Sequence, residues 1–398
     1  MIMKILYITL ENLSLHKGSV IHIKEIVTGL RERGHQVGLI ARSSNSSEKM
    51  EPFYNLEPRP GFIRKYFGLK RQSYLISSFY LFVYLFKVLA RYDVIYARDF
   101  HTVLIALFPR LLFNKKLVYE INGMASEELQ MKGHTYLNRI FVFLVRIAER
   151  MATKYAERIV SVTPQIVSYL MDQYRCPRDK LVIVGNGVNT DMFRPMDQGD
   201  VLSDWRKRLG VSVDDRVVLF VGNLARWQGV EVLIDAAFQV LKTEEKVKFL
   251  IIGEGVLRKG LMEKVLNSGF EKSFIFTGMM DYEVVPFLIN LADICVAPFI
   301  LKRNEKTGVS ALKIFEYMAC GKPVIASMIG GLEFLEAGRA GRLTEPGDPV
   351  VLGEAIKNLL TNPEERLNLG KRGLQIAQGQ FGWSVRTTEI ENILIKMA

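Results

Sequence analysis

Short apolar runs alternate with amphipathic stretches along the whole chain, and this alternation constrains the fold more than any other feature. The first run, residues 4–9, precedes an amphipathic helix pattern over residues 20–33 that stops at Gly34. The same order restarts at residues 216–222, with a helix pattern from Val230. Such alternation is typical of parallel strands covered by helices on both faces. Further strands are expected at residues 37–41, 94–97, 116–121, 158–162, 181–184, 248–252, 274–277, 294–297 and 324–326.

The length and the restart of the pattern both predict two domains. A chain of 398 residues exceeds what one hydrophobic core usually serves. We place an N-terminal domain at residues 1–195 and a C-terminal domain at residues 196–380, with a linker around residues 187–213. A final helix over residues 381–398 is a candidate to cross back to the first domain. Each domain is expected to be α/β and doubly wound, with ligands at the carboxyl ends of its strands.

Charge and cysteine content narrow the class of protein. Residues 1–190 hold 27 Lys and Arg against 15 Asp and Glu, a net charge of +12, while the whole chain carries +11. Such a surface attracts anionic lipid or a phosphorylated substrate, and no aromatic-basic module or zinc spacing favours nucleic acid. The three cysteines show no metal-ligand spacing, which fits a reducing compartment. Since residues 1–8 enter a strand pattern directly, we expect no signal peptide and a cytoplasmic protein.

The stretch of residues 306–327 predicts a phosphate site. A loop of small residues leads into a helix, and a helix N-terminus offers unpaired N–H groups and a positive dipole end to a diphosphate. Lys313 adds a charge in the first turn, and Glu316, one turn further, is placed to accept hydroxyl hydrogen bonds from a ribose. An ordinary helix start remains the alternative. The candidate donor-binding residues here are Thr307, Gly308, Val309, Ser310, Leu312, Lys313 and Glu316.

Other loops lie where this architecture places ligands, and each has a simpler explanation. Gly18 and Ser19 precede the first helix, where backbone can approach a phosphate, or Gly18 is a simple turn residue. Arg226 either clamps phosphate or is a solvated loop cation. Met280 follows a strand and either contacts a base or fills the core. The remaining donor-side candidates are Asn223, Gln228 and Glu254.

Together these segments resemble the retaining glycosyltransferases of family four, whose GT-B architecture has two facing Rossmann-like domains with a ligand cleft between them. The resemblance covers nearly the whole chain. The Asn-Gly-Val segment and the Phe-Glu-Tyr-Met-Ala-Cys-Gly-Lys-Pro block are its specific parts. It rests on the Gly18 loop and on residues 33–37, 186–189, 193, 220–222, 251–255 and 315–323.

The chain also departs from the family pattern. Where the family has the first of two glutamates in the donor loop, this chain has Gly308, and the usual Arg and Lys appear as Asn223 and Gln228. A histidine of the first domain appears as Asn122. Three other segments resemble one branch of the family. They are an Asn-Gly loop followed by Glu127, a Trp-x-Gly turn and a Ser-x-Leu-Lys segment. We interpret the departures as a subfamily pattern.

The resemblance implies sugar transfer from a nucleotide diphosphate sugar, as co-substrate, with retained anomeric configuration. Arg226, Lys313 and the backbone of residues 308–312 would stabilise the departing diphosphate, and Glu316 would hold the ribose. Cationic side chains and helix dipoles would take the place of a metal, and no DxD-type cluster is present, so no cofactor is expected. The resemblance implies catalytic roles for Glu120 and Asn122, as well as for Arg226, Lys313 and Glu316, with Glu120, Asn122 or Glu127 positioning the acceptor or the hydroxyls of the sugar. Glu127 and Arg98 are the candidates on the acceptor side.

The acceptor is expected to be a glycan or a lipid-linked molecule of cell-surface polysaccharide or glycolipid synthesis. Residues 61–71 are basic and aromatic, and residues 74–90 contain one charge, Lys87. The second segment is either a buried helix before the strand at residues 94–97 or part of a face that rests on anionic lipid. Residues 138–150, with three arginines among apolar residues, extend that face. We expect peripheral association with the inner face of the cell membrane.

Two other functional classes stay open at this point. A nucleotide-sugar epimerase shares the architecture but would carry acid and base groups around the donor sugar. The five histidines lie only in the first half and form no evident set. A non-catalytic partner protein would keep the fold and nucleotide binding without turnover. Analysis of reaction products distinguishes these classes.

Overall fold

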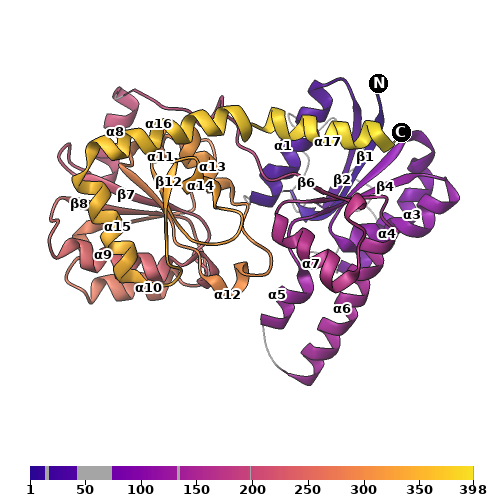
Figure 1. The fold of residues 1–398 in the computed structure, drawn as a ribbon, viewed down its shortest axis with the longest axis horizontal. Coiled ribbons are helices and arrows are strands. Elements are labelled where there is room, and N and C mark those ends of the chain that lie inside the picture. Colours follow the sequence, from indigo (N-terminus) through magenta and orange to yellow (C-terminus); the bar gives the residue numbers. More distant parts are fainter. Residues whose placement is uncertain (14–17, 43–73, 132–134, 198, 398) are drawn as a thin grey trace. The chain divides into compact units, whose positions relative to one another are not determined.

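The structure is a computed structural model, which describes residues 1–13, 18–42, 74–131, 135–197 and 199–397 (Figure 1). The chain forms two compact units, Met1–Gly185 with Trp383–Ala398, and Asn186–Gly382. The basic and aromatic stretch at residues 61–71 lies outside the described residues. None of the helices in the described part combines the length and the apolar composition needed to span a bilayer.

The first unit contains a parallel sheet of six strands, in the order β2-β1-β3-β4-β5-β6. These strands are almost entirely apolar because helices bury both faces of a parallel sheet. The strands are β1 (Lys4–Asn12), β2 (Gln36–Arg42), β3 (Val94–Arg98), β4 (Lys116–Ile121), β5 (Arg158–Ser161) and β6 (Leu181–Ile183). The helices are α1 (Gly18–Glu32), α3 (Tyr74–Val88), α4 (Phe100–Leu112), α5 (Ala125–Met131), α6 (Tyr136–Tyr155), α7 (Pro164–Tyr174) and α17 (Trp383–Met397).

The second unit repeats this plan with the strand order β12-β11-β10-β7-β8-β9, again all parallel. Its strands are β7 (Arg216–Val221), β8 (Val247–Ile252), β9 (Phe274–Gly278), β10 (Ile294–Ala297), β11 (Val324–Ser327) and β12 (Gly341–Thr344). Its helices are α8 (Asp200–Leu209), α9 (Val230–Leu241), α10 (Arg258–Leu266), α11 (Val285–Leu291), α12 (Leu301–Asn304), α13 (Leu312–Ala319), α14 (Phe334–Ala337), α15 (Pro349–Thr361) and α16 (Pro363–Gln380). The predicted α/β class with two doubly wound sheets is confirmed.

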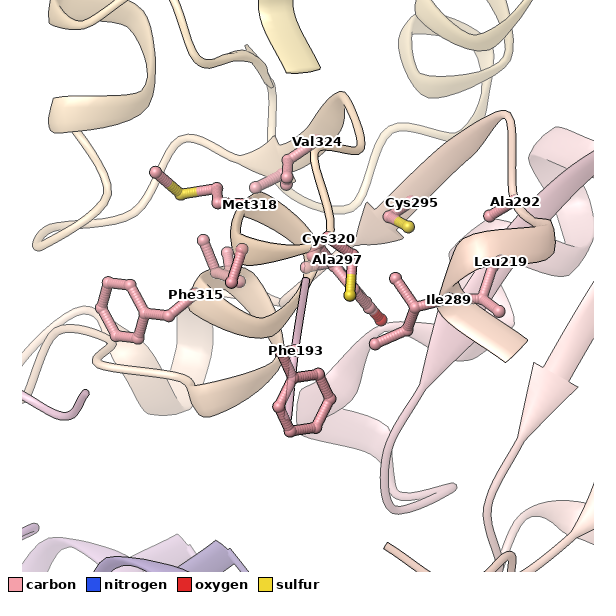
Figure 2. Close-up of a cluster of buried hydrophobic side chains, with 14 of the residues drawn as sticks. Phe193, Leu219, Ile289, Ala292, Cys295, Ala297, Phe315, Met318, Cys320 and Val324 are labelled. Carbon is pink, nitrogen blue, oxygen red and sulfur yellow. The ribbon is translucent and has the colours of Figure 1, made fainter. Parts of the chain in front are cut away.

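The second unit begins earlier in the chain than the boundary expected after residue 195. Phe193 is fully buried and belongs to the core of the second unit, together with Leu219, Ile289 and Phe315 (Figure 2). Val188 belongs to the same core. The Asn-Gly-Val segment and the residues after it are therefore part of the second unit, because their apolar side chains are buried there.

The last helix, α17, packs on α1 within the first unit (Figure 1). A Cβ added to Gly29 of α1 would lie 2.5 Å from Oγ1 of Thr387, so this glycine permits the close approach of the two helices. Glu391 of α17 pairs with Arg33 at 3.1 Å and with Nε2 of His35 at 3.0 Å. These contacts hold the C-terminal helix against α1 and the residues that follow α1.

Candidate active site

Three loops at the carboxyl ends of β7, β8 and β9 are joined by backbone hydrogen bonds. The N–H of Gly222 donates to the carbonyl of Ile252 at 2.9 Å, and the N–H of Gly253 donates to the carbonyl of Gly278 at 2.8 Å. Gly253 has a φ of +132°, and a Cβ there would lie 2.0 Å from the carbonyl oxygen of Gly222. Glycine at this position therefore lets the first two loops approach each other closely.

The loop before α13 is held by the protein itself. The N–H of Gly308 donates to Asn304 at 2.8 Å, and the N–H of Val309 donates to Gly330 at 2.9 Å. The hydroxyl of Ser310 accepts a hydrogen bond from the N–H of Asn186 at 2.9 Å. The N–H groups of Gly308 and Val309 therefore both have protein partners.

Lys313 is the buried cation of this region. Its Nζ donates a hydrogen bond to Oε1 of Gln228 at 2.7 Å and lies 4.2 Å from the centre of the Phe220 ring. Phe299 contributes a second ring at 5.3 Å. Burial lowers the pKa of Lys313 to about 7, while the nearby carboxylate of Glu316 acts in the opposite direction. An anion bound beside this ammonium would favour its protonated form.

Glu316 lies one turn further along α13 and is buried as well. Its Oε1 accepts a hydrogen bond from the hydroxyl of Tyr282 at 2.9 Å. Burial raises the pKa of Glu316 to about 7, and Tyr282 and Lys313 oppose this rise. The first two turns of α13 thus carry a cation and a carboxyl group that both titrate near neutral pH, a pattern that clusters at functional sites.

The other donor candidates of the second unit are more exposed. Asn223 and Arg226 are exposed, Arg226 lying at the start of a short 3-10 helix (Arg226–Gln228). Glu254 is partly exposed and pairs with Nε of Arg258 at 3.4 Å. Met280 packs partly buried against the hydrophobic core. Thr307 and Leu312 are each partly buried around the loop before α13.

Gly18 and Ser19 begin α1 in the first unit, whereas the other donor candidates belong to the second. The first unit holds a separate polar cluster beneath the ends of its central strands. Glu120 of β4 is 1% exposed and pairs with Arg98 of β3 and with Nε2 of His22 at 3.0 Å. The hydroxyl of Tyr7 donates to its Oε2 at 3.3 Å.

These partners set the charge of Glu120. Burial alone would raise the pKa of its carboxyl group, but the His22 and Arg98 side chains and a hydrogen bond from Asn122 hold it well below its usual range. A buried carboxylate surrounded in this way stays ionised and positions its neighbours. It is therefore poorly placed to touch a substrate directly.

Asn122 follows β4 and is exposed, so it lies where a substrate can reach it. Its Nδ2 donates to Oε1 of Glu120 at 2.7 Å. Since the carboxylate orients the amide, the carbonyl oxygen of Asn122 is left to accept a hydrogen bond from a hydroxyl group.

Glu127 lies in α5 and is buried against α6 and α7. Its Oε1 accepts hydrogen bonds from the hydroxyl of Tyr169 at 2.8 Å and from Arg146 at 3.1 Å. A neighbouring carboxyl group, Glu149, was not predicted from the sequence and accepts from the hydroxyls of Ser126 and Tyr174, each at 2.7 Å. These bonds fix the packing of the three helices.

The sequence did not identify Tyr282 as the partner of Glu316, or Tyr7 and His22 as partners of Glu120. Tyr7 and Glu120 are separated by 113 residues, and Tyr282 and Glu316 by 34. No local pattern marks such pairs. Within the described residues, no group of three or more His, Cys, Asp or Glu side chains is arranged to hold a metal ion.

Comparison with known families agrees with this fold. Residues 16–192 match the family described as Glycosyltransferase Family 4. Residues 215–362 match the family described as Glycosyl transferases group 1. The two matches thus cover most of each unit.

Curated relatives and solved structures include further glycosyltransferases. The chain is 25% identical over 293 residues to alpha-D-kanosaminyltransferase of Streptomyces kanamyceticus, covering 72% of this chain and 73% of that protein. It is 24% identical over 386 residues to an uncharacterised glycosyltransferase of Methanocaldococcus jannaschii, covering 94% and 93%.

Two solved structures share the fold over nearly the whole chain. HepE of Anabaena, in complex with UDP and glucose, aligns with a TM-score of 0.75 and 21% identity over 98% of this chain and 99% of that one. Sucrose-phosphate synthase of Thermosynechococcus elongatus aligns with a TM-score of 0.76 and 21% identity over 99% of each chain. The chain therefore belongs to the family 4 glycosyltransferases, has the GT-B fold, and is a glycosyltransferase.

Proposed function

We propose that this glycosyltransferase moves a sugar from a nucleotide diphosphate sugar to a glycan or lipid-linked acceptor, with retained anomeric configuration. The observation that carries the donor assignment is the buried pair of Lys313 and Glu316 in the first turns of α13. A burial this deep is costly for both groups unless a ligand of complementary chemistry compensates. A diphosphate beside the ammonium and a ribose beside the carboxylate would do so. Solved relatives of this fold include HepE in complex with UDP-glucose, which supports the same class of donor here.

In the proposed reaction, the bond between the anomeric carbon and the diphosphate oxygen breaks as negative charge grows on the diphosphate. Lys313, the first turn of α13 and Arg226 stabilise that charge, so that no metal is required. The acceptor oxygen bonds to the anomeric carbon on the face that the diphosphate leaves, and its proton passes to a phosphate oxygen. Asn122 accepts a hydrogen bond from a hydroxyl of the sugar or the acceptor, with Glu120 as its positioning residue.

The proposed setting is cell-surface polysaccharide or glycolipid synthesis on the cytoplasmic side of the membrane, with the protein attached peripherally. Its support is the net charge of +12 in residues 1–190. An anionic leaflet attracts such a surface. The alternative of an epimerase has less support, because the kanosaminyl relative is named as a transferase.

The donor site is tested by thermal shift with a panel of nucleotide diphosphates and nucleotide sugars. We expect one nucleotide family to stabilise the protein. Glu316→Ala should weaken that binding by about 10–100-fold, since a hydrogen bond to a charged group is lost. Glu271→Ala, which removes an exposed carboxylate of the same unit, is the matched control and should bind as the wild type does. Equal stabilisation of the wild type and Glu316→Ala would disprove the ribose role.

Donor affinity is expected to be greatest near pH 7. As pH rises from about 7 to 9, Lys313 loses its proton and affinity falls, approaching about tenfold per pH unit. As pH falls below 7, Glu316 becomes protonated and accepts ribose hydroxyls less well. The measurement is calorimetric titration with a nucleotide sugar, whose diphosphate does not titrate in this range. Lys313→Met should lose the alkaline fall, and a flat wild-type profile would contradict the assignment.

A further inference from the structure

The first unit buries one side of helix α6. Val142, Glu149, Ala152 and Thr153 are buried, and α6 contacts α4, α5 and α7 on this side. Glu149 is anchored there by Ser126. The packing of the first unit thus accounts for only one side of this long helix.

The opposite side, here called the outer face of α6, is apolar and exposed. Its members recur at intervals of three or four residues, so they share one side of the helix. They are between 40% and 73% exposed, which is unusual for a row of large apolar side chains in a folded domain. The outer face consists of Leu137, Ile140, Phe143, Leu144, Ile147 and Met151.

The neighbouring helix α4 also exposes large apolar side chains. Phe108, Leu111 and Leu112 at the end of α4 are between 62% and 68% exposed. Since α4 contacts α6, the first unit presents apolar side chains from two adjacent helices. Large exposed apolar side chains in such number mark an interaction site.

The exposed charges that α6 itself carries are all positive. Arg139, Arg150 and Lys154 are exposed, and Arg139 and Arg150 flank the same edge of the apolar row. Glu149, the one acidic residue of α6, is buried on the other side. A helix with an apolar row, flanking cations and no exposed acid has the composition of helices that lie in a membrane interface.

Charge also distinguishes a membrane from a second copy of the chain. A symmetric dimer through this face would bring the cations of one copy against the same cations of the other, with no acid on α6 to pair with them. An anionic leaflet supplies the opposite charge at about 1 kcal/mol per cation. The observations therefore favour lipid as the occupant.

We propose that the outer face of α6 inserts into the headgroup region of an anionic membrane, with Arg139 and Arg150 pairing with lipid phosphates. This inference rests on the proposed peripheral association and identifies the part of the chain that makes the contact. The helix that would attach the protein to the membrane, α6, carries none of the donor-binding candidates.

The test is sedimentation with vesicles of phosphatidylcholine alone or mixed with phosphatidylglycerol, at low salt. The triple variant Leu137→Gln, Phe143→Gln, Leu144→Gln should bind the anionic vesicles at least about tenfold more weakly than the wild type. Arg139→Gln with Arg150→Gln should weaken binding by roughly 25-fold, or fivefold per cation, at low ionic strength. Neither double nor triple variant should change the stabilisation by nucleotide sugar.

The matched control replaces three exposed apolar residues of the second unit, Val213→Gln, Leu266→Gln and Leu367→Gln, and should bind vesicles as the wild type does. If the triple variant does not fold, the arginine variant still decides the result. If the α6 variants bind vesicles as the wild type does, this inference is wrong. The protein would then associate with the membrane through another surface. Failure of the wild type to bind would overturn both. Self-association of the wild type that the triple variant loses would identify a second copy as the occupant instead.

Discussion

Lys313→Met is expected to lower kcat/KM for sugar transfer by about 10²–10³-fold, equivalent to about 2.7–4 kcal/mol of transition-state stabilisation. Methionine retains the apolar stem between the rings of Phe220 and Phe299 but removes the charge. Because the diphosphate gains charge as the glycosidic bond breaks, losing this cation should affect the transition state more than the bound donor. Steady-state kinetics with varied donor measures the effect.

Two comparisons separate this role from a structural one. Lys302→Met removes an exposed lysine near the same loop and should leave kcat/KM within about threefold of the wild type. The thermal midpoint of Lys313→Met should be no lower than that of the wild type by more than a few degrees, since a buried ammonium contributes little to stability. Transfer at the wild-type rate in Lys313→Met would show that another group stabilises the diphosphate.

Glu120→Ala is expected to destabilise the first unit by about 3–5 kcal/mol, because it leaves Arg98 buried without its carboxylate. For a unit of this size the thermal midpoint should fall by roughly 6–20 °C. Differential scanning calorimetry measures the change. A nucleotide sugar, which should stabilise the second unit, helps to assign the two transitions.

The double variant Glu120→Ala, Arg98→Met tests the reason for the loss. Removing both charges should recover much of the stability, since the penalty arises from the unpaired guanidinium. Glu32→Ala, at an exposed position of α1, is the control and should change stability by at most about 0.5 kcal/mol. An unchanged transition in Glu120→Ala would mean that water or another group compensates Arg98.

The strands were predictable because a strand buried on both faces must be a nearly continuous apolar run. β1, β4 and β7 follow that pattern closely. The helix α8 was not predicted, and its residues were assigned to a linker, because this polar helix buries only Leu202. β12 was missed for a similar reason, since Arg342 is exposed in a strand of four residues.

The candidate donor site could be predicted in part. The spacing of Lys313 and Glu316 on one helix is a local property of the sequence, and α13 carries both as expected. Gln228 was identified as a departure from the family pattern, but its hydrogen bond to Lys313 joins residues 85 positions apart.

On the acceptor side, the sequence identified Glu120 and Asn122 as neighbours but assigned them similar roles. The structure separates the roles, because Glu120 is enclosed by Arg98, His22 and Tyr7 while Asn122 is exposed. We therefore infer that Asn122 meets the substrate and that Glu120 orients it.

The sequence by itself determined the α/β class, the family and the helix that carries Lys313 and Glu316, because periodicity, loop glycines and short motifs are local properties of the chain. The tertiary structure decided which of these groups are buried, which partners they have and where their pKa values lie. Burial and electrostatic contacts come from segments that are distant in the chain, so residue type and spacing do not reveal them. The exposed outer face of α6 was decided in the same way, since only packing shows which side of the helix is covered.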